Sequence, residues 1–158
     1  MEPRIVELDT LYLVGLPFYG DASDGQFGKT WDRFNKVVKH IKNRVNQTVA
    51  YGVEIYGEEF HTEQKWLYFA SVTVSDLAET PDILFGKILP AATYAVFTVK
   101  GGVDKISETF RYAYDQWLPA SKYQMAYPFD FELYDERFKG HEPDSELDLY
   151  LPVKLKSG

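Results

Sequence analysis

The chain has 158 residues, of which 45% are hydrophobic and 26% charged, so it is long enough to form one domain with a sizeable core. Its formal net charge of −7 argues against direct binding to nucleic acid, because phosphate backbones attract basic surfaces. The absence of cysteine excludes disulfides, thiol catalysis and thiolate metal sites. The sequence contains neither a signal peptide nor an apolar run of membrane-spanning length, so we expect a cytoplasmic protein without membrane association.

The first half of the sequence predicts a strand, a helix and two further strands. Residues 4–16 are rich in β-branched and apolar residues and predict a half-buried strand. Apolar residues recur at helical spacing over residues 27–44, which predicts an amphipathic helix. Residues 50–56 and 66–74 predict a hairpin, and residues 76–85 predict an acidic loop.

The second half predicts the same order of elements. Residues 94–100 predict a strand, and Asp104 is placed to cap a helix that Pro119 helps to end. Residues 127–135 and 146–156 predict two more strands. We therefore expect an α+β fold in a single domain, residues 1–158, built from two fused βαββ repeats at about 4–75 and 92–156.

Two such repeats side by side predict one antiparallel sheet, with two helices on one face and a ligand groove between the repeats. A βαββ unit leaves the other face of its sheet uncovered by its own helix. We expect that opposite face to be open to a ligand or a partner.

The strand predicted at residues 127–135 has two chemically different faces, because side chains alternate along a strand. The two sets are Phe129, Phe131 and Leu133 on one face, and Asp130, Glu132 and Tyr134 on the other. Glu132 is the strongest candidate for a binding residue. A buried carboxylate without a partner attracts a cation, and neighbouring rings add cation–π contacts. A solvent-facing position for Glu132 is the alternative.

Six further residues are candidates for the same groove: Tyr134, Glu54, Tyr56, Trp66, Tyr68 and Trp31. Tyr134 shares the face of Glu132, and Glu54 and Tyr56 form the corresponding pair in the first repeat, where Gly52 leaves space. Trp66 and Tyr68 share a parity on the next strand, where their rings could stack on a ligand. Ordinary surface positions are the alternative for these strand residues. Core packing is the favoured interpretation for Trp31, which we keep as a reserve candidate because the long first helix is placed to flank the groove.

Residues 90–101 (PAATYAVFTVKG) and the stretch from Ile106 through residues 117–121 (WLPAS) resemble the second repeat of gyrase-inhibitor-like small-molecule-binding domains. Residues 131–135 (FELYD) and 147–154 (LDLYLPVK) continue the match. Residues 51–56 and 68–72 match more loosely. Such domains also serve as effector-binding domains of AraC-type and MerR-type transcription regulators.

The resemblance implies two fused βαββ repeats that bind amphipathic, often cationic aromatic compounds through rings and a buried glutamate, which the match places at Glu132. The family also includes a small gyrase inhibitor and hydrolases of reactive natural products. Because no DNA-binding helical region flanks the matched residues, we expect a stand-alone ligand-binding module.

Catalytic and metal sites find little support in the sequence. His40, His61 and His141 lack metal-ligand spacing, and neither a phosphate-binding loop nor a nucleophile elbow occurs. We therefore expect no cofactor, no metal and no catalytic residue. Two alternatives stay open: a hydrolase in which Glu132 activates water, and a protein inhibitor of DNA gyrase. A homodimer or a separate regulatory protein is the expected partner besides the small molecule.

Overall fold

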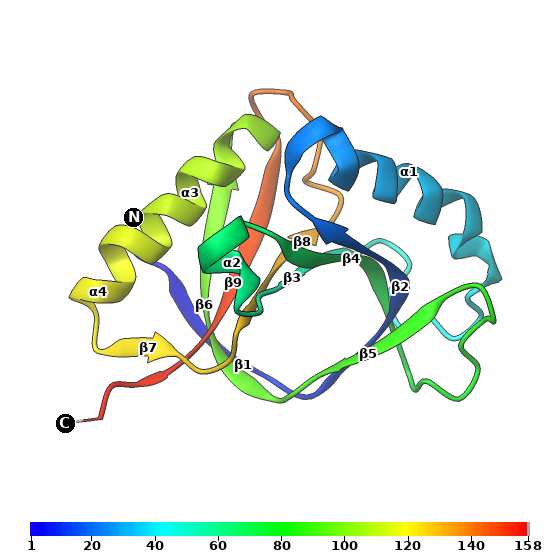
Figure 1. The fold of residues 1–158 in the computed structure, drawn as a ribbon, viewed down its shortest axis with the longest axis horizontal. Helices are drawn as coiled ribbons and strands as arrows, with labels where there is room; N and C mark the ends of the chain where they lie inside the picture. Colours follow the sequence, from blue (N-terminus) through cyan, green and yellow to red (C-terminus); the bar gives the residue numbers. More distant parts are fainter. Residues whose placement is uncertain (158) are drawn as a thin grey trace.

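The computed structural model describes residues 1–157, and within them the chain forms a single nine-stranded antiparallel sheet (Figure 1). The neighbouring strands follow the order β1-β6-β9-β8-β3-β4-β2-β5, and β7 pairs with β9. The strands are β1 (Arg4–Leu8), β2 (Leu11–Gly20), β3 (Ala50–Ile55), β4 (Trp66–Val74), β5 (Phe85–Leu89), β6 (Ala92–Lys100), β7 (Tyr123–Met125), β8 (Phe129–Tyr134) and β9 (Glu146–Leu155). The expected α+β fold with a large antiparallel sheet is confirmed.

Four helices accompany the sheet: α1 (Gln26–Val37), α2 (Glu59–Glu63), α3 (Ile106–Tyr112) and α4 (Leu118–Ala120). A π-helical turn, Ala113–Trp117, joins α3 to α4. Figure 1 shows α1 and the α3–α4 segment towards the two sides of the molecule, with α2, β3 and β8 between them. None of these helices is both long and apolar enough to cross a membrane.

The prediction of a single strand at residues 4–16 is wrong, because the two parts of this segment pair with different strands. β1 pairs with β6, whereas β2 pairs with β4 and β5. The later segment 85–100 divides in the same way into β5 and β6, and Pro90, which has no N–H to donate, lies at the break. The short strand β1 therefore lies beside β6 in the second half, although the chain continues from it into β2. Likewise, β5 lies beside β2 in the first half, although the chain continues from it into β6.

Three other boundaries differ from the prediction. β5 begins where only a loop was expected, and β7 is an additional short strand. The first helix ends at Val37 rather than near residue 44, and a 3₁₀ turn follows it. Beyond this turn the chain meets the end of β4: Val45 N–H donates to the Thr73 carbonyl oxygen (3.1 Å), and Arg44 forms an isolated bridge with Val74.

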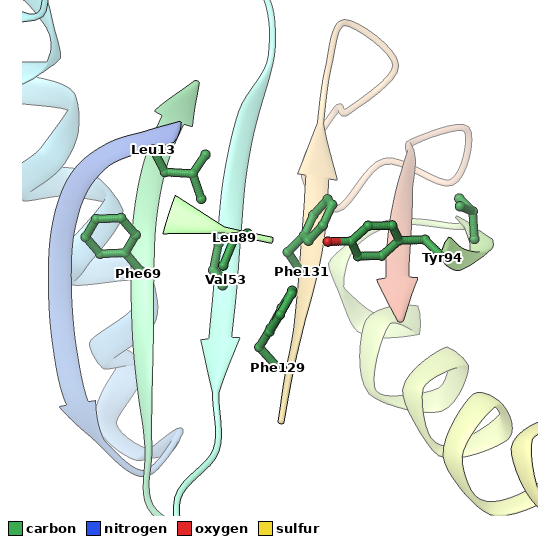
Figure 2. Packing of buried hydrophobic residues seen from close by; sticks show 8 residues of the cluster. Leu13, Val53, Phe69, Leu89, Tyr94, Phe129 and Phe131 are labelled. Atoms are coloured by element: carbon green, nitrogen blue, oxygen red, sulfur yellow. The ribbon is translucent and has the colours of Figure 1, made fainter. Parts of the chain in front are cut away.

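The sheet face opposite the helices is a closed hydrophobic core, so the expectation that it is open to a ligand is wrong. Figure 2 shows rings and aliphatic side chains from strands of both halves meeting on this face. They include Leu13, Val53, Phe69, Leu89, Tyr94, Phe129 and Phe131, all of them buried. The larger cavity of the domain lies on the helix-bearing face instead.

Two further clusters fix the helices to that other face. Phe34 of α1 packs with Val72 and Val74 of β4 and their neighbours. Ala113 and Trp117 of the π-helical turn pack with Phe97 of β6 and its neighbours. Each helix is thus fixed to its own half of the sheet by its apolar stripe, and the surface of β3 and β8 between the helices is covered by neither stripe.

Candidate functional site

A cavity of about 1230 Å³ lies over β3, β4 and β8, and residues of α1, α2 and α3 form its sides. All seven residues singled out from the sequence line it: Trp31, Glu54, Tyr56, Trp66, Tyr68, Glu132 and Tyr134. The structure thus brings together side chains from α1, from β3 and the residue directly after it, from β4 and from β8. The sequence related these residues only through the alternation of side chains along strands and the similar order of elements in the two halves.

Strand register explains why the acidic residues meet. In the β3–β8 ladder Gly52 pairs with Glu132 and Glu54 pairs with Asp130, while Glu54 also pairs with Tyr68 across the β3–β4 ladder. Side chains of directly paired residues lie on the same face of a sheet. Three carboxyl groups therefore fall side by side on the helix-bearing face.

Glu132 lies at the centre of a hydrogen-bonded group on the α1 side of the cavity. Its Oε1 accepts hydrogen bonds from the hydroxyls of Tyr68 (3.1 Å) and Tyr134 (2.5 Å). Trp31 Nε1–H donates to the Tyr68 hydroxyl oxygen (2.8 Å), which ties helix α1 to the floor of the cavity. The side chain of Glu132 is held in place by three elements, and only 5% of the residue is exposed.

Asp130 forms a second group on the α3 side, and it was not among the predicted site residues. Its Oδ2 accepts hydrogen bonds from the hydroxyls of Tyr114 (2.6 Å) and Tyr56 (2.8 Å), both of which line the cavity. Its Oδ1 is buried and has no hydrogen-bond partner within residues 1–157. Parity places Asp130 beside Glu132, but no local pattern in the sequence connects this carboxyl group with Tyr114 of the π-helical turn.

Three buried carboxyl groups without a salt-bridge partner among the described residues dominate the electrostatics of the site. Glu54, Asp130 and Glu132 are 6%, 0% and 5% exposed, and none of them forms a salt bridge within the described part of the chain. Burial raises the pKa of Glu54 well above its usual range, and the charges of Asp130 and Glu132 raise it further. Burial also raises the pKa of Asp130 to about 7, against the lowering effect of hydrogen bonds from Tyr114 and Tyr56. The site therefore favours a positive charge beside these groups.

The surrounding tyrosines act as hydrogen-bond donors. Burial is the largest cause that raises the pKa of Tyr56, Tyr68, Tyr114 and Tyr134, and the neighbouring carboxylates raise it further. Their hydroxyl groups stay protonated at neutral pH and hold the carboxyl oxygens in place.

Aromatic rings form much of the remaining wall. Phe27 of α1 stacks on Tyr68 with ring centres 4.2 Å apart, and Phe60 of α2 contacts both Tyr56 (4.7 Å) and Trp66 (5.6 Å). Phe27 and Phe60 were not among the predicted site residues. Phe27 was assigned to the buried stripe of the helix, and Phe60 lies in a segment expected to be a turn. Such rings offer flat apolar surfaces to an aromatic ligand.

The fold and this site define a small-molecule-binding domain with a closed core on one side of its sheet and an acidic, aromatic cavity on the other. Residues 4–153 match the family model described as integron-associated effector binding protein. The chain belongs to this family of effector-binding proteins, and the resemblance to gyrase-inhibitor-like domains noted from the sequence is confirmed.

Three similar proteins illustrate the relationship. The transcriptional regulator BrlR of Pseudomonas aeruginosa is 33% identical over 156 residues, which are 97% of this chain and 56% of BrlR, so the chain spans little more than half of that relative. The solved structure of SAV2435 bound to tetraphenylphosphonium superposes with a TM-score of 0.75 at 20% identity, covering 98% of this chain and 94% of the other. EcmrR in its DNA complex superposes with a TM-score of 0.72 at 14% identity, covering 98% and 58%.

Proposed function

We propose that this domain binds amphipathic aromatic cations in the cavity between α1 and α3, with the cationic centre beside Glu132 and Glu54. The single observation that carries the proposal is the group of buried carboxyls without a basic partner. A carboxylate removed from water without a counter-charge is costly, so a cation that enters the cavity gains the attraction that no side chain supplies.

The walls of the cavity support the same class of ligand. The rings of four residues line it: Trp31, Trp66, Tyr68 and Phe27. A cation over such a ring is stabilised by about 0.5 kcal/mol at an exposed site and by about 2 kcal/mol when it is desolvated. Its volume of about 1230 Å³ exceeds the roughly 300–1,000 Å³ usual for small-molecule pockets, which leaves room for several ligand rings. The structural relative SAV2435 was solved with tetraphenylphosphonium, a cation of this kind.

Binding of tetraphenylphosphonium, measured by calorimetry and by thermal shift, tests the proposal. A ligand that binds only the folded state at 100 times its Kd stabilises it by about 2.7 kcal/mol. Triphenylphosphine oxide is the control, since it keeps three rings but carries no net charge. We expect clear stabilisation by the cation and little by the neutral compound. Equal effects of the two compounds, or no binding by either, would overturn the proposal.

Two further assays separate this function from the two alternatives. Turnover of an electrophilic compound that is lost in Glu132→Ala would assign the cavity to a hydrolase. Inhibition of DNA supercoiling by the purified chain, without any binding of cations, would assign it to a gyrase inhibitor.

A further inference from the structure

Glu54, Asp130 and Glu132 form a compact acidic group in which each member is more than nine-tenths buried. Glu54 lies directly opposite Asp130 in the β3–β8 ladder, and Glu132 is the next residue on the same face of β8. Three adjacent carboxylates without a cation repel one another strongly in a site of low dielectric constant. This arrangement therefore disfavours the state in which all three are ionised at once.

The hydrogen bonds around Tyr56 point to a proton within this group. Its hydroxyl has a single hydrogen, yet it lies 2.8 Å from Asp130 Oδ2 and 3.3 Å from Glu54 Oε2. Asp130 Oδ2 also accepts from Tyr114, so it is well supplied with donors. Two separate, full-strength hydrogen bonds at Tyr56 require one of the two carboxyl groups to carry a proton and donate it, since otherwise the single hydroxyl hydrogen is shared between both acceptors.

We propose that the ligand-free site holds at least one proton on the Glu54–Asp130 pair beside Glu132, and that an entering cation expels this proton to solvent, so that ligand binding is coupled to proton release. The inference rests on the proposed function, because it concerns the same cavity and the same class of ligand. The charge balance is simple: the cation brings one positive charge into the group and the departing proton removes one. The raised pKa values of Glu54 and Asp130, caused mainly by burial, agree with a proton held near neutral pH.

Other titratable groups surround the three carboxyls and belong to the argument. Four tyrosines face them and remain protonated hydroxyls: Tyr56 directly after β3, Tyr68 of β4, Tyr114 of the π-helical turn and Tyr134 of β8. His61, Arg111, Asp32 and Asp115 also line the cavity. His61 is the imidazole of the rim, so a variant of this residue is the control that separates the rim from the acidic group.

The coupling predicts how affinity depends on pH. For each proton expelled, the association constant rises by at most about tenfold per pH unit over the range in which the empty site is protonated. Tetraphenylphosphonium is a suitable probe because it has no group that titrates. Its affinity is therefore expected to fall as the pH is lowered from 8 to 5.5.

Calorimetric titrations with tetraphenylphosphonium, at several pH values and in two buffers of different ionisation enthalpy, provide the test. We expect the apparent binding enthalpy to differ between the buffers by an amount that corresponds to release of about one proton near neutral pH. Equal enthalpies in both buffers together with a constant Kd would overturn the coupling and leave cation binding intact. No binding at any pH would overturn the coupling and the proposed function together.

Two variants locate the source of the proton. Glu54→Gln removes one carboxyl of the group and should reduce both the number of protons released and the slope of affinity against pH. His61→Gln removes the histidine of the rim and should keep that slope. A slope that disappears in His61→Gln but persists in Glu54→Gln would overturn the proposal. Asp130→Asn is a second probe of the acidic group if Glu54→Gln does not fold, and it too should flatten the slope.

Discussion

Gly52 and Glu132 are paired across the β3–β8 ladder, and the absence of a side chain on Gly52 makes room for the carboxylate of Glu132 to meet the hydroxyl of Tyr68. A Cβ atom at position 52 would lie 2.9 Å from Glu132 Oε1 and still closer to the Tyr68 hydroxyl. The floor of the cavity thus depends on a residue that contributes no chemical group to it.

Gly52→Ala is therefore expected to destabilise the fold by about 1–3 kcal/mol, because overpacking displaces buried side chains. It should also weaken cation binding by disturbing the Tyr68–Glu132 hydrogen bond. Urea unfolding and calorimetry measure the two effects. Gly28→Ala is the matched control for stability: nothing lies within 4 Å of its new methyl group, and replacing a helical glycine of α1 should stabilise the fold by up to about 1 kcal/mol. Destabilisation of both variants to the same extent would contradict the packing argument.

Glu132→Gln keeps the size of the side chain and removes its charge. We expect the affinity for tetraphenylphosphonium to fall by about 2 kcal/mol, or roughly thirtyfold in Kd, and the affinity for a neutral analogue to change little. Glu136→Gln removes the same charge from an exposed position outside the cavity and serves as the control. Similar losses in the two variants would show that overall charge, and not the cavity carboxylate, attracts the ligand.

Trp31→Phe keeps an aromatic ring on α1 but removes the N–H that donates to Tyr68. Loss of a hydrogen bond of this kind costs about 1 kcal/mol, which predicts a roughly fivefold weaker binding of the cation. Trp117→Phe is the control variant. Trp117 lies in the π-helical turn after α3, and its ring packs on Phe97 of β6. This variant should lower the unfolding midpoint without changing Kd. A Kd that is unchanged in Trp31→Phe would mean that the link between α1 and the sheet has no part in binding.

The buried acid also predicts how the stability of the unliganded protein depends on pH. The pKa of Asp130 is raised to about 7 in the folded state, whereas an unfolded aspartate titrates near 3.9. Between these values the folded state holds a proton that the unfolded state has lost, so this group makes stability fall as the pH rises from about 4 to 7. Glu54 acts in the same direction.

Asp130→Asn should flatten that dependence, because the asparagine side chain does not titrate. Urea unfolding of the wild type and the variant at pH 5, 6 and 7.5 measures it. The wild type is expected to lose stability over this interval relative to the variant. Parallel curves for the two proteins would show that Asp130 is ionised throughout.

The fold and the site differ in how far the sequence predicts them. Alternation along residues 127–135 places Phe129 and Phe131 in the core and Glu132 on the other face, because burial of one face of a strand determines its register. Local patterns cannot show that β1 leaves its neighbour β2 to pair with β6, since pairing between distant segments is decided by the whole sheet. The alternation of side chains also does not indicate the importance of Asp130, because this depends on the hydrogen bond that Tyr114 donates from the opposite side of the cavity.

The exchange of strands between the halves has a consequence for how the chain acquires its structure. Arg4 pairs with Val96, so β1 has no partner until nearly two thirds of the sequence has been joined to it. Such non-local pairs form late, because the entropy of closing a long loop must be overcome before any hydrogen bond compensates for it. A fragment that ends at Leu89 leaves β1 without β6, and the two halves therefore fold and unfold together in one cooperative transition.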